Sequence, residues 1–219
     1  MTTPPLATAA DIAANIAAVQ QRIQRAAERA GRDPAGITLV GVSKTFPATA
    51  VHLAHAAGLR HFGENFVQES EEKLPACADL TPRPTWHFIG HLQTNKVRTV
   101  LGLFDLIESV DSLHLAEAIA KRAGEHPARV LLEVNVAAEA SKFGFAPAEV
   151  PAAVAHLRGL PGIEVAGLMT VAPDAPDPAA VRPVFRQLRQ LGDGLGLTEF
   201  SMGMTNDFEV AIEEGATII

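Results

Sequence analysis

The chain has little of the material that cross-links a protein, anchors it in a membrane or attracts nucleic acid. Its 219 residues include one cysteine, Cys77, so no disulfide can form within the chain, which predicts a reducing, cytoplasmic location. No apolar run approaches the roughly 20 residues that a membrane-spanning helix needs, and residues 1–10 lack the pattern of a signal peptide. The net charge of −7 counts against a nucleic-acid-binding protein. These absences predict a cytoplasmic protein that binds a small molecule, no nucleic acid and no membrane.

The sequence does contain a repeated alternation of short apolar runs and segments with helical spacing. An amphipathic helix is predicted over residues 8–30, before the alternation begins. Eight runs of strand length follow at residues 37–42, 59–62, 86–89, 103–110, 130–136, 163–171, 199–204 and 216–219. Helical segments separate them at residues 48–57, 65–74, 94–102, 112–123, 147–158, 178–191 and 206–214.

Strand followed by helix, repeated without hairpins, indicates a parallel sheet with helical crossovers. Eight such units in a chain of this length favour closure into an α/β barrel of the (β/α)₈, or TIM-barrel, type over an open doubly wound sheet. No linker or low-complexity stretch divides the sequence. We therefore expect residues 1–219 to form a single barrel domain, with the helix 8–30 packed on its outside.

Lys44 follows the first predicted strand directly, and active sites of this fold gather at the carboxyl ends of the strands. Partial desolvation there lowers the pKa of an amine, and the neutral amine can attack an aldehyde. A lysine whose stem lies along apolar surface with its ammonium in water explains the position too. Position alone leaves both interpretations open.

The stretch Ser201–Glu209 (SMGMTNDFE) leads from the seventh predicted strand into a helix. Gly203 permits close backbone approach, and Thr205 or Asn206 is a candidate N-cap. Free N–H groups at such a helix start can bind a phosphate, although a plain capping motif is the alternative. Phosphate sites of this fold commonly follow strands 7 and 8, which favours the anion site.

The remaining polar motifs are less specific. His87 and His91 are four apart, but Gly90 lies between them and the run starts as a strand, so they would not share a helix face. His52 and His55 could share one, but no third ligand is evident near them, so no metal site is predicted. Gly63-Glu64-Asn65 closes the second predicted strand. Asn65 is either a helix cap or part of a polar pair over the barrel mouth beside Lys44. The spacing of the residues does not distinguish between these two roles.

Six motifs in register give the chain a family resemblance. They are Val42–Thr45 (VSKT), His61–Asn65 (HFGEN), Trp86–Lys96 (WHFIGHLQTNK), Ser141–Gly144 (SKFG), Gly167–Met169 (GLM) and Ser201–Glu209. Together they resemble the pyridoxal-phosphate homeostasis proteins, the YggS or PROSC family, over about residues 8–219. That family is itself similar to the N-terminal barrel domain of alanine racemase.

The resemblance implies a monomeric barrel that binds pyridoxal 5′-phosphate (PLP) through an imine with Lys44. It also implies that Asn65 and His87 lie near the cofactor ring, and that Lys142 matches a second family lysine near the pocket. The phosphate-binding turn of the family matches Ser201, Gly203, Met204 and Thr205. Such proteins are regarded as carriers or regulators of PLP in vitamin B6 homeostasis, without established catalytic turnover.

The family pattern continues beyond Ile219 with an arginine, an apolar residue and a glycine. From the resemblance, we expect those residues to finish the eighth strand and to complete the phosphate site.

Two other functions remain open. A PLP-dependent racemase would use Lys44 as a proton shuttle and needs a second acid/base, which in alanine racemase is a tyrosine. This chain contains no tyrosine, so Lys142 or His87 would have to replace it. A lysine-imine aldolase on the same barrel would need no phosphate-binding turn.

Overall fold

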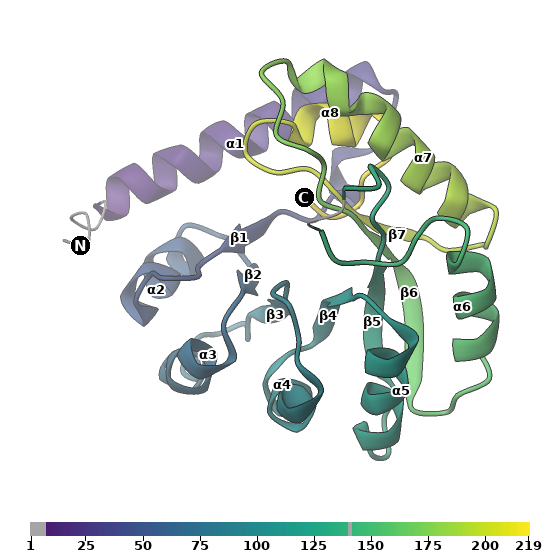
Figure 1. Cartoon of the computed structure of the whole chain (residues 1–219). Helices are drawn as coiled ribbons and strands as arrows, with labels where there is room; N and C mark the ends of the chain where they lie inside the picture. The colour runs from purple at the N-terminus through teal and green to yellow at the C-terminus, as the bar shows by residue number, and fades with distance from the viewer. Residues whose placement is uncertain (1–7, 140–141) are drawn as a thin grey trace.

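The computed structural model describes residues 8–139 and 142–219 of the chain (Figure 1). Residues 1–7 of the predicted domain and Ser141 of the predicted SKFG motif lie outside the described part.

Seven parallel strands form one sheet, in which each strand pairs with the next one along the chain. They are β1 (Val40–Val42), β2 (His61–Glu64), β3 (Thr85–Phe88), β4 (Leu106–Val110), β5 (Ala128–Glu133), β6 (Ile163–Met169) and β7 (Glu199–Ser201). All seven overlap apolar runs of the sequence, so the predicted parallel sheet with helical crossovers is confirmed. Figure 1 shows the sheet curling, with its helices around the outside.

The sheet closes on itself through the last residues of the chain. Ile218 forms isolated parallel bridges to Ser201 on one side and to Thr38 on the other. The Thr38 amide donates to the Thr217 carbonyl at 2.8 Å, and the Val40 amide donates to the Ile219 carbonyl at 2.9 Å. The predicted count of eight strands is not confirmed, because only Thr217–Ile219 run alongside β7 and β1 and they form no full strand.

Eight α-helices are described, with short 3₁₀ turns between some of them. They are α1 (Ala9–Arg29), α2 (Ala48–Ala56), α3 (Val67–Lys73), α4 (Val97–Leu103), α5 (Leu113–Arg122), α6 (Val150–Leu157), α7 (Arg182–Asp193) and α8 (Phe208–Glu213). None of the described helices is long and apolar enough to cross a membrane.

The predicted N-terminal helix is confirmed as α1, which begins at a capping box between Thr8 and Asp11. It lies against α8 in Figure 1, on the outside of the sheet. Apolar side chains of the two helices pack together, and Arg22 donates to Glu209 at 3.1 Å across the contact.

Alternation along the strands separates two apolar layers. Val130 and Leu132 of β5 belong to the large core between the sheet and its helices. Leu131 instead packs inside the ring with Leu106, Met169 and Ile218. Because side chains alternate along a strand, Glu133 shares the inner face with Leu131, at the carboxyl end of β5. We call the end of the ring formed by the carboxyl ends of the strands the mouth, and the opposite end the base.

Candidate functional site

The turn that carries Lys44 projects from the mouth just beyond β1. Lys44 is exposed, so the partial burial expected from the sequence is wrong: the turn extends past the last residue of the sheet. Among the described residues, the Lys44 amine has no hydrogen-bond or ion-pair partner. Thr45, the next residue, has a φ of +67°, a left-handed conformation that β-branched residues rarely adopt.

The residues after β2 support this turn. Glu64 is fully buried and accepts a hydrogen bond from the Ser43 hydroxyl at 2.6 Å. Asn65 follows directly, and Gly90 allows its backbone to come close: a Cβ on Gly90 would lie 2.1 Å from the Asn65 carbonyl oxygen. The helix-cap interpretation of Asn65 is wrong, because α3 begins at Val67 without any side-chain cap.

The predicted phosphate turn lies after β7, but it does not open a long helix. Gly203 has a φ of +99°, and a Cβ there would lie 2.7 Å from that of Ala211, so the close approach expected at this glycine is confirmed. The predicted N-cap at Thr205 or Asn206 is wrong, because α8 begins at Phe208 and has only six residues. A helix this short contributes little dipole, so any anion at the turn depends on backbone N–H groups and hydroxyls.

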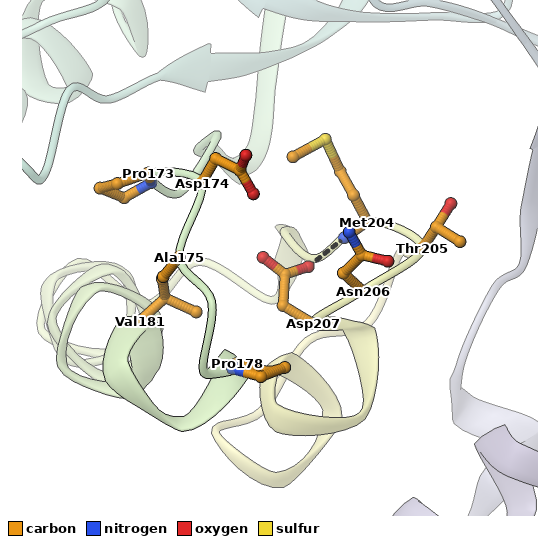
Figure 2. Close-up of a pocket in the computed structure, with 9 residues that line it drawn as sticks. All are labelled: Pro173, Asp174, Ala175, Pro178, Val181, Met204, Thr205, Asn206 and Asp207. Carbon is orange, nitrogen blue, oxygen red and sulfur yellow. Dashed lines mark hydrogen bonds between the residues drawn. The ribbon is translucent and has the colours of Figure 1, made fainter.

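One of those N–H groups already has a partner. The Met204 amide donates to the Asp207 carboxylate at 2.5 Å, as the dashed line in Figure 2 shows. The turn lines a cavity of about 230 Å³, which the Asp174 and Asp207 side chains also line. Two carboxylates disfavour an anion in this cavity. A phosphate that binds the Met204 amide must therefore displace Asp207.

A buried chain of hydrogen bonds joins two predicted site residues. Glu108, 2% exposed, accepts from the Ser201 hydroxyl at 2.6 Å and makes a short contact with Nδ1 of His87. His87 Nε2 lies 3.0 Å from Nδ1 of His61, near the base. Because a carboxylate only accepts, His87 donates from Nδ1 and accepts at Nε2. Burial lowers the pKa of His61, which favours a neutral imidazole that donates to His87 from Nδ1.

Lys142 is in a different situation from Lys44. Its amine lies 2.5 Å from Glu139 Oε1 and donates to the carbonyl oxygens of Val171 and Ala172, both at 3.1 Å. These contacts hold the loop after β5 against the loop after β6.

Sequence reasoning missed two carboxyl groups inside the ring. Glu108 binds His87 and Ser201, as described above. Burial raises the pKa of Glu133 to about 7, and the negative charge of Asp111 adds to the shift. The alternation along β5, with Arg129, Leu131 and Glu133 on one face, was the available signal for Glu133. The described residues contain no cluster of three or more side chains able to hold a metal ion.

The structure places Lys44 and the turn Ser201–Thr205 at the same end of the ring. The strands that precede them, β1 and β7, are separated only by the bridging residue Ile218. Asn65 lies at the end of the strand next to β1. His87 is enclosed deeper in the ring and is linked to Ser201 only through Glu108. The Lys142 amine is held by the loops after β5 and β6.

Comparison with known proteins identifies the family. The model of the alanine racemase N-terminal domain matches residues 14–216. A pyridoxal phosphate homeostasis protein of Pseudomonas aeruginosa is 48% identical over 94% of this chain and 90% of its own length. The corresponding protein of Aquifex aeolicus is 46% identical over 92% of this chain and 91% of its own length. The chain belongs to the pyridoxal phosphate homeostasis protein family.

Solved structures agree with this assignment. PipY of Synechococcus elongatus, solved with PLP bound, is 38% identical, with a TM-score of 0.78 over 90% of this chain and 96% of that one. An alanine racemase of Clostridium difficile is only 12% identical, with a TM-score of 0.68 over 91% of this chain and 54% of its own. The predicted alanine-racemase-like α/β fold is therefore confirmed.

Proposed function

We propose that this protein binds pyridoxal 5′-phosphate through an imine with Lys44 and acts as a carrier or regulator of PLP in vitamin B6 homeostasis, without catalytic turnover. The observation that carries the proposal is the amine of Lys44, which is without a partner in the described residues, at the mouth of an alanine-racemase-like fold. The PLP-bound structure of PipY, a relative 38% identical, supports it.

The bound cofactor supplies an aldehyde. The neutral amine of Lys44 attacks the aldehyde carbon, a C=N bond forms and one water molecule leaves. Lys142 is less suited to this reaction, because its amine is already held by Glu139 and two carbonyl oxygens. Reversible imine formation suits a carrier, since water can release the aldehyde again.

The turn Ser201–Thr205 fits the phosphate end of the cofactor. Gly203 and Met204 offer backbone N–H groups and Thr205 offers a hydroxyl, which are suitable ligands of a phosphate. The Ser201 hydroxyl already donates to Glu108 at 2.6 Å, so Ser201 binds the phosphate only when it gives up that bond. Asp207 holds the Met204 amide at 2.5 Å and would be displaced on binding.

Two further residues complete the proposed cofactor site. We assign Asn65 to a position beside the cofactor ring, because it follows β2, the strand next to the one that precedes Lys44. Both ring nitrogens of His87 are engaged, so we assign His87 the role of fixing Glu108 and, through it, Ser201.

The test is reduction of the PLP-loaded protein with borohydride, followed by peptide mapping. We expect the pyridoxyl label on Lys44. Lys44→Ala should abolish the yellow adduct and leave the stability unchanged, because this exposed side chain packs in no core. Lys142→Ala is the matched control and should keep the label. Thr205→Ala should keep the label but weaken PLP retention by about 1–2 kcal/mol. A label on Lys142 or Lys96 would contradict the assignment.

A racemase-type enzyme is the second candidate, and one observation favours it. Glu133, with its pKa raised to about 7, lies on the inner face of β5 at the mouth and can hold or release a proton near neutral pH. An assay for exchange of the α-hydrogen of amino acids by the PLP-loaded protein separates the two functions. Exchange that Glu133→Gln removes would establish the enzyme.

We also propose that the protein is a cytoplasmic monomer that binds no nucleic acid. The residues assigned to the PLP site all come from one chain, and the net charge of −7 opposes binding to a polyanion. Light scattering of the purified protein tests the monomer, and a salt titration with duplex DNA tests the absence of binding.

A further inference from the structure

A second lysine, Lys73 at the end of α3, is buried directly beneath the turn that carries Lys44. The Lys73 side chain is 4% exposed. Its ammonium donates to the Ser43 carbonyl at 2.7 Å, to Glu64 Oε1 at 2.8 Å and to Glu69 Oε1 at 2.5 Å. Burying an ammonium is unfavourable unless oxygens replace its water, and here three oxygens do so.

The two carboxylates that bind Lys73, those of Glu64 and Glu69, also form hydrogen bonds to the residues on either side of Lys44. Glu64 Oε1 accepts from the Ser43 hydroxyl at 2.6 Å, on the residue before Lys44. Glu69 Oε1 accepts from the Thr45 amide at 2.7 Å, on the residue after it. The peptide on each side of Lys44 is therefore fixed through Lys73, while the Lys44 side chain takes part in none of these bonds.

The backbone at this point needs such support. Thr45 has a φ of +67°, a conformation that a residue with a β-branched side chain keeps only when its surroundings impose it. Two hydrogen bonds impose it here. The Phe46 amide donates to the Ser43 carbonyl at 3.1 Å. The Thr45 amide donates to Glu69 at 2.7 Å, and this is the contact that a side chain of α3 makes with Thr45. Without the bond to Glu69 the turn can relax to an ordinary conformation, which would change the direction of the Lys44 side chain.

We propose that Lys73, acting through Glu69 and Glu64, is a positioning residue that holds the Ser43–Thr45 turn in the conformation in which Lys44 forms its imine. This inference rests on the proposed PLP site. It assigns to α3 a role in covalent bond formation, separate from the residues that bind the phosphate.

Glu69→Ala is the main test, because it removes the Thr45 anchor and leaves Lys73 paired with Glu64 and the Ser43 carbonyl. Glu69→Gln should behave nearly as the parent protein, since its amide oxygen can still accept from the Thr45 amide. Glu72→Ala is the matched control, because Glu72 is an exposed residue of the same helix. Lys73→Met removes the whole network.

Two ligands distinguish a loss of Lys44 positioning from a general loss of cofactor binding. PLP reports imine formation through its absorbance, and pyridoxine 5′-phosphate has the same ring and phosphate but no aldehyde. We expect Glu69→Ala and Lys73→Met to slow imine formation at least tenfold while their affinity for pyridoxine 5′-phosphate changes less than twofold. Equal losses for both ligands, or no change in imine formation, would overturn the proposal. If Lys73→Met does not fold, Glu69→Ala decides alone.

A measurement on the ligand-free protein makes the proposal independent of PLP. Hydrogen exchange of the Thr45 amide should be at least tenfold faster in Glu69→Ala than in the parent protein and in Glu72→Ala. Unchanged exchange would show that Glu69 does not hold the turn. If instead Lys44→Ala keeps a reducible adduct, the proposed PLP site fails, whatever the exchange at Thr45 shows.

Discussion

The two ends of the ring differ in how completely their polar groups are paired. At the base, Arg129 pairs with Glu199, Arg83 pairs with Asp105 at 2.8 Å, and His61 contacts His87. At the mouth, Lys44 has no partner among the described residues, and Glu133 is held in an environment that disfavours its charge. Several large apolar side chains near the mouth are also exposed, namely Val42, Phe46, Phe66, Phe143, Val171 and Met204.

Cavity size does not predict which end is functional. The cavity at the base measures about 310 Å³, against about 230 Å³ beside the phosphate turn. Its charged groups pair with one another, as is usual at the end of a barrel that serves stability. The amine of Lys44, unpaired among the described residues, and the raised pKa of Glu133, rather than the cavity volume, are the reasons for which we propose the PLP site at the mouth.

Removing the carboxylate that links the two ends should have the largest effect on stability. Glu108→Ala leaves the buried His87 and the half-buried Ser201 without their acceptor, and we expect a loss of about 3 kcal/mol in the free energy of unfolding, measured with denaturant. Glu164→Ala, at a side chain 60% exposed near the base, is the control and should stay within about 0.5 kcal/mol of the parent protein. Equal effects of the two substitutions would show that the buried chain is not important for stability.

The negative charge of Glu133, at the mouth, should destabilise the folded protein at high pH. Below the ordinary pKa of 4.5 both the folded and the unfolded chain keep the proton, so the group has no effect. Between pH 4.5 and about 7 the unfolded chain loses the proton first, so stability falls as the pH rises, and it levels off above the folded-state pKa.

Glu133→Gln should remove this pH dependence. We expect the variant to be more stable than the parent protein by up to about 3 kcal/mol at pH 8 and equally stable at pH 4.5. Thermal unfolding at the two pH values measures the difference. A gain of the same size at both pH values would point to packing rather than to the proton.

Substitution at the base should have the smallest effect. Arg129 pairs with Glu199 and Glu164, but its side chain is 45% exposed. Arg129→Ala should therefore lower the free energy of unfolding by less than about 1 kcal/mol and leave PLP binding unchanged. A marked loss of PLP binding would show that the base also contributes to the PLP site, so the two ends would not have separate roles.

Periodicity was enough to predict most of the fold. The apolar runs located all seven strands and α1, because alternation and helical spacing are local properties of the sequence. Helical spacing predicts a helix from residue 206, but α8 begins two residues later at Phe208, because the Asp207 side chain binds the Met204 amide. The eighth strand was predicted from Ala216–Ile219, where pairing with β7 and β1 is limited to one bridged residue.

The site could be predicted only in part. Lys44 and the turn Ser201–Thr205 lie directly at the ends of predicted strands, so their positions at the mouth could be predicted from the sequence. The pairing of Glu108 with His87 and Ser201 joins residues 21 and 93 positions apart, and no local pattern reports such contacts. Lys73 stands among charged residues of a short helix, which is no local sign of burial, and only the packing of α3 beneath the Ser43–Thr45 turn shows that it is buried.

The seam between Ile218 and Thr38 has a consequence for the order of folding. It joins the two ends of the sequence, as does the ion pair between Arg22 and Glu209, whose residues are 187 positions apart. The strands β1 to β7 pair with sequence neighbours, so their loops are short, whereas the seam must close a loop of nearly the whole chain. We therefore expect the curled sheet to assemble first and the ring to close late, so that substitutions at the seam would speed unfolding more than they slow folding.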